Sequence, residues 1–61
     1  MITRTGGAWT HEYTCNSNDL TELQTKYVKA NKDIPNGSTC LNMDGPDVYM
    51  YDLEEDTWKK L

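Results

Sequence analysis

One histidine, two cysteines and a group of acidic residues are the side chains whose types could do chemistry. His11 is the only histidine, and no serine, cysteine or carboxylate is placed with it in a recognisable triad motif. A lone histidine in a strand-like segment is more often structural than catalytic. We therefore expect a protein that is not an enzyme.

The two cysteines, Cys15 and Cys40, belong to no C-x-x-C or Cys/His cluster with metal-ligand spacing. No metal or cofactor is expected. A disulfide between them would close a loop of about 26 residues and stabilise the fold by roughly 3 kcal/mol. Residues 1–7 lack the apolar run of a signal peptide, and no stretch is long enough to span a membrane. We expect buried free thiols in a reducing cytosol, with a disulfide as the alternative.

The acidic residues are concentrated near the C-terminal end of the chain. The net charge is −4, and residues 44–56 contain six acids and no base. Such a surface repels phosphate backbones, so direct binding to nucleic acid is disfavoured. The acids lack the spacing of an EF-hand. We interpret them as solvated turn residues, with a mimic of nucleic-acid charge as the alternative.

Residues 48–61 predict a β-hairpin. Val48 and Met50 point to one face while Tyr49 and Tyr51 point to the other, and these residue types suit strands. After an acidic loop of about four or five residues the pattern resumes, which places Trp58 across from a tyrosine. Both faces of the hairpin are apolar. We therefore expect a helix over one face and a partner or another strand over the other.

The rest of the chain predicts the elements that cover this hairpin. Residues 8–15 alternate like a half-buried strand, with Trp9, His11, Tyr13 and Cys15 on one face. Residues 19–31 predict a helix, which Asp19 caps. Residues 38–43 predict a second strand that leads into the hairpin.

The element order is therefore β-α-β-β-β. We predict a small α+β domain over residues 8–61, with one helix packed on an antiparallel sheet, and a flexible N-terminal arm over residues 1–7.

The chain is short for the number of large rings that it carries. A chain of 61 residues buries only about 60% of its unfolded surface, and domains of this size often depend on oligomerisation or docking. A homo-oligomer or multi-copy assembly is expected. The predicted core draws on the two tryptophans, the four tyrosines and Leu20, Leu23, Val28, Ile34, Leu41, Met43, Val48 and Met50.

Two resemblances follow from these motifs. Val-Tyr-Met-Tyr-Asp at 48–52 and Thr-Trp-Lys-Lys-Leu at 57–61 resemble the hairpin of a kelch propeller blade, although a propeller needs several four-stranded blades. The wider pattern over residues 18–61 adds an Asp-Leu helix start, Pro-Asn-Gly-Ser-Thr at 35–39 and Asp44. It resembles small structural proteins of tailed phages and prophages of Gram-positive bacteria.

The second resemblance implies a virion component that is made in the host cytoplasm. It would be a capsid decoration or cementing protein, or a head-appendage adaptor, which binds a capsid or other virion protein in many copies. The alternative is a small acidic phage-encoded inhibitor that binds a host protein. We predict partner contacts from the arm and from aromatic residues, of which core packing must claim at least half: Ile2, Arg4, Trp9, Tyr13, Tyr49, Tyr51 and Trp58.

Overall fold

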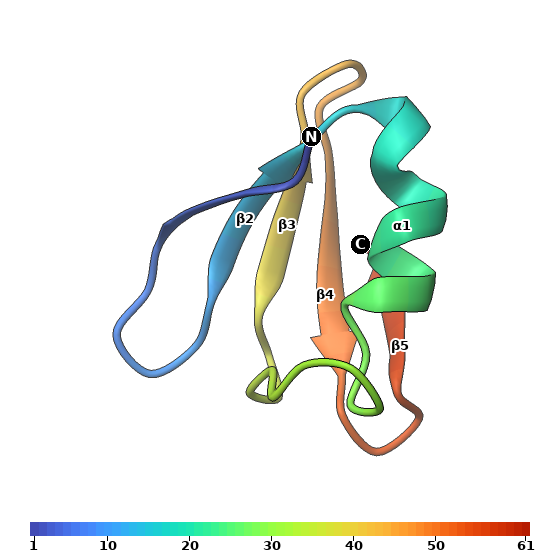
Figure 1. Ribbon diagram of the computed structural model, residues 1–61. Coiled ribbons are helices and arrows are strands. Elements are labelled where there is room, and N and C mark those ends of the chain that lie inside the picture. Colours follow the sequence, from blue (N-terminus) through green and yellow to red (C-terminus); the bar gives the residue numbers. More distant parts are fainter.

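The computed structural model describes residues 1–61 and contains one short helix beside a five-stranded sheet (Figure 1). The strand order is β1-β2-β3-β4-β5; β2 and β3 are parallel, and the other neighbouring pairs are antiparallel. The predicted α+β class is confirmed, with a mixed sheet because the helix lies in the crossover between β2 and β3. The elements are β1 (Thr3–Gly6), β2 (Glu12–Cys15), the 3-10 helix η1 (Ser17–Asp19), α1 (Leu20–Lys26), β3 (Thr39–Asn42), β4 (Asp47–Asp52) and β5 (Thr57–Lys60).

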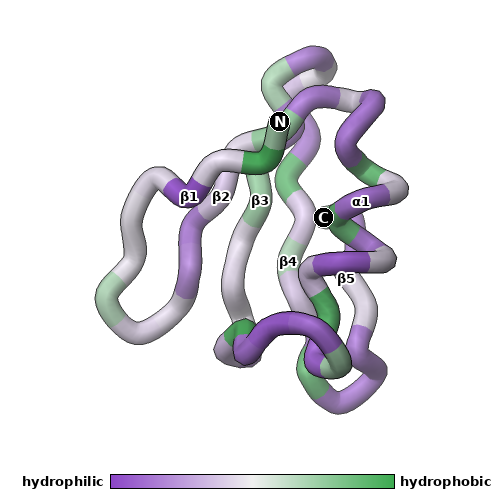
Figure 2. Tube along the Cα trace, in the orientation of Figure 1, coloured by the Kyte–Doolittle hydropathy of each residue, from purple (hydrophilic) through white to green (hydrophobic).

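The segment predicted as an N-terminal arm is part of the sheet. Residues 3–6 form β1, which pairs with β2 through Thr3↔Thr14 and Arg4↔Tyr13. The N-terminal amine of Met1 also donates to Asp19 Oδ2, at 2.6 Å. All of β1 is exposed, and its hydropathy is neutral apart from one hydrophilic segment (Figure 2). A strand that buries neither face leaves no alternation in the sequence, which is why residues 1–7 were expected to lie outside the sheet.

Helix α1 is shorter than the helix predicted over residues 19–31. It ends at Lys26, and Tyr27 leaves helical geometry with φ −95° and ψ 56°. Beyond that point the Lys29 N–H donates to Asp56 Oδ1, at 3.0 Å, instead of to a carbonyl of the helix. The helical spacing of apolar residues continues past Lys26, but a tertiary hydrogen bond to the β4–β5 turn replaces the next turn of helix.

The core lies between α1 and one face of the sheet. Alternate strand residues point to this face, so that Tyr13 and Cys15 are buried while the neighbouring Glu12 and Thr14 are not. The opposite face carries no helix (Figure 1). The buried apolar residues are Tyr13, Cys15, Leu23, Ile34, Cys40, Tyr51 and Trp58.

The predicted C-terminal hairpin is confirmed. Strands β4 and β5 pair in antiparallel register with Tyr51 opposite Trp58, whose ring centroids are 5.2 Å apart. The turn spans residues 53–56, and Asp56 adopts a positive φ of 54°. Aromatic pairs of this kind add about 0.5–1.5 kcal/mol to the effect of burial alone. The aromatic pair therefore ties β4 to β5 within the core.

Candidate interaction surface

His11, the only histidine, is hydrogen-bonded within the fold. The His11 ring lies 2.8 Å from the Tyr13 hydroxyl through Nδ1 and is half-buried. Its backbone N–H donates to Ser38 Oγ, and its carbonyl accepts from the Thr39 N–H. No group of three or more His, Cys, Asp or Glu side chains could hold a metal ion. His11 thus joins the start of β2 to the start of β3.

The two thiols meet in the core. Cys15 and Cys40 are free, 1% and 0% exposed, with their Sγ atoms 3.3 Å apart. Burial raises the pKa of Cys40 to about 12. The β2–β3 register pairs Cys15 with Asn42 and Cys40 with Tyr13. The two Cα atoms are therefore roughly 8 Å apart, beyond the reach of an unstrained disulfide. This geometry favours buried free thiols over a pair.

The acidic residues lie at two separate ends of the molecule. The β3–β4 turn, with Asp44, and the β4–β5 turn, with residues 53–56, flank opposite ends of β4 (Figure 1). Strand β4 has six residues, so the two turns are about 20 Å apart. The charges consequently form no single patch, which weakens the idea that they mimic a nucleic acid.

Several of these carboxylates accept hydrogen bonds from other parts of the fold. Asp44 accepts from the Ser17 N–H at 2.7 Å and from Asn16 Nδ2 at 2.9 Å, and these bonds lower its pKa. Asp56 accepts from the Tyr51 hydroxyl at 2.5 Å and from the Lys29 N–H, which lower its pKa too. These two side chains hold loops to strands.

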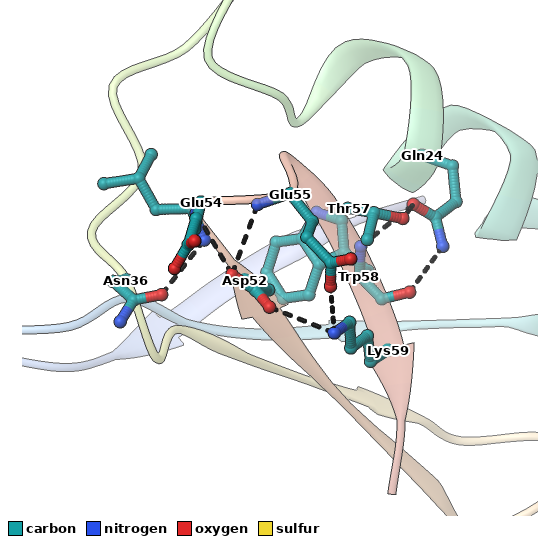
Figure 3. A network of polar contacts seen from close by, with 9 residues as sticks. Gln24, Asn36, Asp52, Glu54, Glu55, Thr57, Trp58 and Lys59 are labelled. Carbon is teal, nitrogen blue, oxygen red and sulfur yellow. Dashed lines mark hydrogen bonds and ion pairs between the residues drawn. The ribbon is translucent and has the colours of Figure 1, made fainter.

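A polar network covers the end of the C-terminal hairpin (Figure 3). Lys59 Nζ lies 3.1 Å from Asp52 Oδ2 and also contacts Glu55. The Asp52 carboxylate accepts from the Glu54 N–H at 3.0 Å, and the neighbouring Lys59 lowers its pKa. This part of the acidic turn is thereby partly neutralised.

The face of the sheet opposite α1 carries an apolar patch. Leu41 is paired with Val48 in the β3–β4 register, and the Leu61 N–H donates to the Val48 carbonyl. Met50 lies two residues beyond Val48 on the same face. We call these four residues the open-face patch. They are half-buried or exposed: Val48 is intermediate, and Leu41, Met50 and Leu61 are 37%, 38% and 72% exposed.

A shallow hollow adjoins the open-face patch. Its volume is ≈ 270 Å³, and Lys59 and Asp52 are among the residues at its wall. It is lined by Asn36, Gly37, Met50, Tyr51, Asp52, Lys59 and Leu61.

The structure separates the aromatic residues predicted as partner contacts. Tyr13, Tyr51 and Trp58 are 8%, 1% and 3% exposed, so these three belong to the core. Tyr49 is half-buried against the core. Trp9 is 91% exposed. The aromatic rings on the sheet face that packs against α1 are buried in the core.

The β1–β2 loop holds Trp9 in solvent. The predicted strand over residues 8–15 begins only at Glu12, because Gly7 has φ 100° and starts a tight turn. A Cβ atom at Gly7 would stand 1.9 Å from the Thr10 carbonyl oxygen, so the turn requires glycine there. Arg4 donates from Nη2 to the Gly7 carbonyl at 3.1 Å. These contacts fix the conformation of the loop, and the Trp9 ring remains exposed to solvent.

The two remaining predicted contacts are on and beside β1. Arg4 is exposed, and Ile2 is half-buried against the core. Sequence reasoning expected a second apolar face on the hairpin, covered by a partner or another strand, but it assigned Leu41 and Met50 to the core and did not name them as contacts. Met43, also expected there, is 61% exposed. The alternation along β3 and β4 signalled two apolar faces, and only the position of α1 decides which one is covered.

No helix combines the length and apolar composition needed to cross a membrane. Comparisons with protein-family models, with curated proteins and with solved structures find no match to this chain.

Proposed function

We propose that this protein is a non-enzymatic structural component that attaches to a larger protein assembly through its open-face patch. The observation that carries the proposal is the patch itself, because its four apolar residues adjoin one another on the helix-free face of the sheet. Contiguous apolar surface of this kind marks sites of protein contact, whereas single exposed residues do not.

The composition of the surface around the patch supports the same proposal. Lys59 and Asp52 stand beside Met50 and are paired with each other at 3.1 Å. An apolar centre with a polar rim is the usual anatomy of a protein interface. Four residues form a small contact area, so one copy would bind weakly and many copies would bind tightly together.

A phage virion is the assembly that we propose, on the basis of the sequence resemblance. In that setting the protein would decorate or cement a capsid, or connect a head appendage, in many copies. The acidic-inhibitor alternative has less support, because the acids are divided between two ends of β4 and several are bonded within the fold.

The proposal is tested on purified virions of the phage or lysogen that encodes the protein. Quantitative mass spectrometry is expected to find many copies in each particle. Met50→Lys is expected to lower that copy number, because it places a charge in the patch. Leu53→Lys is the matched control, since Leu53 is 39% exposed in the β4–β5 turn and lies outside the patch.

Two results would overturn the proposal. One is absence of the protein from particles together with capture of a host enzyme from lysate, which would support the inhibitor. The other is an equal loss of incorporation with Met50→Lys and Leu53→Lys while both variants melt like the wild type. That outcome would remove the open-face patch from the contact.

A further inference from the structure

The β5 edge of the sheet is closed by a side chain of α1. Gln24 donates from Nε2 to the Trp58 carbonyl oxygen at 2.7 Å and accepts from the Trp58 N–H through Oε1 at 3.0 Å (Figure 3). One amide thereby makes the two hydrogen bonds that a neighbouring strand would make. Thr57 Oγ1 donates to the same Gln24 oxygen at 3.2 Å. Another chain cannot pair at this point without displacing Gln24.

The β1 edge is covered only at Gly6, whose carbonyl accepts from Arg4 Nε at 3.3 Å, and its pairing with β2 is irregular between Arg4 and Gly6. Strand β1 (Thr3–Gly6) pairs only with β2, and all of its residues are exposed. An edge strand presents alternate N–H and C=O groups that can pair with another strand. The edge is also held in place, because Ile2 packs against the core and Arg4 bonds to the Gly6 and Gly7 carbonyls. Pairing would therefore cost little additional ordering.

The two most exposed large apolar side chains flank this edge. Trp9 follows β1 and is 91% exposed, while Met1 precedes it and is 87% exposed. If two β1 strands pair antiparallel about a twofold axis, the end of one strand meets the start of the other. The loop that carries Trp9 then approaches the Met1 end of the other copy. Methionine sulfur packs favourably on aromatic rings, and the contact occurs twice because the interface is isologous.

The charge distribution makes β1 the edge at which two copies repel each other least. Six of the acids lie in residues 44–56, around β4 and β5 at the other side of the sheet. Within residues 1–15 the only acid is Glu12, and Arg4 offsets it. A chain with net charge −4 thus presents a nearly neutral edge to a second copy.

We propose that two copies of this chain pair through β1 into a twofold-symmetric dimer with one continuous sheet. The closed β5 edge ends the assembly at two copies, because a sheet open at both edges would continue to add chains. The interface is separate from the open-face patch, so the dimer does not depend on the proposed function. Each strand contributes four residues, which places the contact at the weak end of specific interfaces.

The first test is sedimentation velocity over about a hundredfold range of concentration. The wild type is expected to move from the mass of one chain towards twice that mass. Trp9→Ser is expected to weaken dimerisation about tenfold or more, as loss of a central aromatic contact does. Leu53→Ser, in the distant β4–β5 turn, is the matched control and should dimerise like the wild type. A monomer at every concentration, or equal behaviour of the two variants, would overturn the proposal.

The second test locates the interface by cross-linking. Thr5→Cys on β1 and Lys60→Cys on β5 each add one exposed thiol, while the native Cys15 and Cys40 are buried. A short bis-maleimide is expected to link two copies of Thr5→Cys and to leave Lys60→Cys unlinked. If Lys60→Cys links as readily, or if Thr5→Cys fails to link under conditions where it sediments as a dimer, the β1 interface is rejected.

Discussion

The two edges of the sheet each carry one of the two tryptophans, and the two rings have opposite environments. At the β5 edge, Trp58 is 3% exposed, and its Nε1–H donates to the Tyr27 carbonyl at 2.8 Å. At the β1 edge, Trp9 stands on a loop in solvent. The same residue type therefore stabilises the fold at one edge and remains available for contact at the other.

The width of the single helix explains this difference. Helix α1 runs along the strands (Figure 1) and is about 10–12 Å wide with its side chains, whereas five strands span about 19 Å. The helix lies against β5 (Figure 1) and leaves β1 exposed, while β2 still turns Tyr13 and Cys15 into the core. One short helix cannot enclose a sheet of this width, so the core extends from β5 to β2 while the β1 edge remains free.

The sharpest test of this comparison truncates each tryptophan in turn. Trp58→Ala is expected to lower the free energy of unfolding by about 3–5 kcal/mol, because it empties a buried site. Trp9→Ala is expected to change that free energy by less than about 0.5 kcal/mol. Urea denaturation, at concentrations where the chain is monomeric, measures both. Similar losses from the two substitutions would contradict the assignment of separate roles.

Alkaline pH is expected to destabilise the fold through ionisation of Tyr51. Burial and the hydrogen bond to Asp56 raise the pKa of Tyr51 to about 12, from about 10 in the unfolded chain. The folded state binds the hydroxyl proton of Tyr51 more tightly than the unfolded chain does. The stabilisation that the protonated Tyr51 gives is therefore complete below pH 10. It is lost as pH rises towards 12, and amounts to about 2–3 kcal/mol.

Ultraviolet titration of tyrosine together with circular dichroism follows this change. In the wild type, loss of structure should accompany ionisation of the last tyrosine to titrate. Tyr51→Phe should flatten the stability curve between pH 10 and 12. Persistence of the same slope in that variant would show that another group controls alkaline unfolding.

Removing the Gln24 side chain, which closes the β5 edge, is expected to have an intermediate effect on the free energy of unfolding. Gln24→Ala leaves the Trp58 N–H and carbonyl without their side-chain partner, at a cost of about 1–3 kcal/mol. Hydrogen exchange at the Trp58 amide should accelerate, and light scattering should reveal assemblies larger than a dimer. Thr21→Ala, another exposed position on α1, is the control. If the two variants exchange and scatter alike, Gln24 does not protect the edge.

The smallest expected effect is a loss of stability at acidic pH. Bonds to the backbone and to side chains hold the pKa values of Asp44 and Asp56 below their usual range. Their stabilising contribution is therefore present above the unfolded pKa of about 3.9 and disappears as pH falls through the lower folded value. The melting temperature should be nearly constant above about pH 5 and fall below pH 4.

Substitutions identify the carboxylates responsible for this acid sensitivity. Asp56→Asn and Asp44→Asn should each make the fall of the melting temperature in acid shallower. Asp33→Asn, at an exposed position, should leave that fall unchanged. An unchanged decline in both Asp44→Asn and Asp56→Asn would assign the sensitivity to other groups.

Local patterns in the sequence predicted part of the candidate surface. Alternation correctly divided β4 into a face with Tyr49 and Tyr51 and a face with Val48 and Met50. The same rule misplaced Trp9, because it continued the strand backwards through a turn that depends on the positive φ of Gly7. It also missed β1, where neither face is buried.

By itself, the sequence determined the α+β class, the C-terminal hairpin and the position of Trp58 across from a tyrosine. These features follow from residue spacing over a few positions, which local geometry translates directly into faces and turns. Only the tertiary structure decided that α1 stops at Lys26, that residues 3–6 join the sheet and that one edge is closed by Gln24. The helix end and the Gln24 contact depend on residues far apart in the chain, and β1 buries neither face, so none of the three leaves a periodic trace in the sequence.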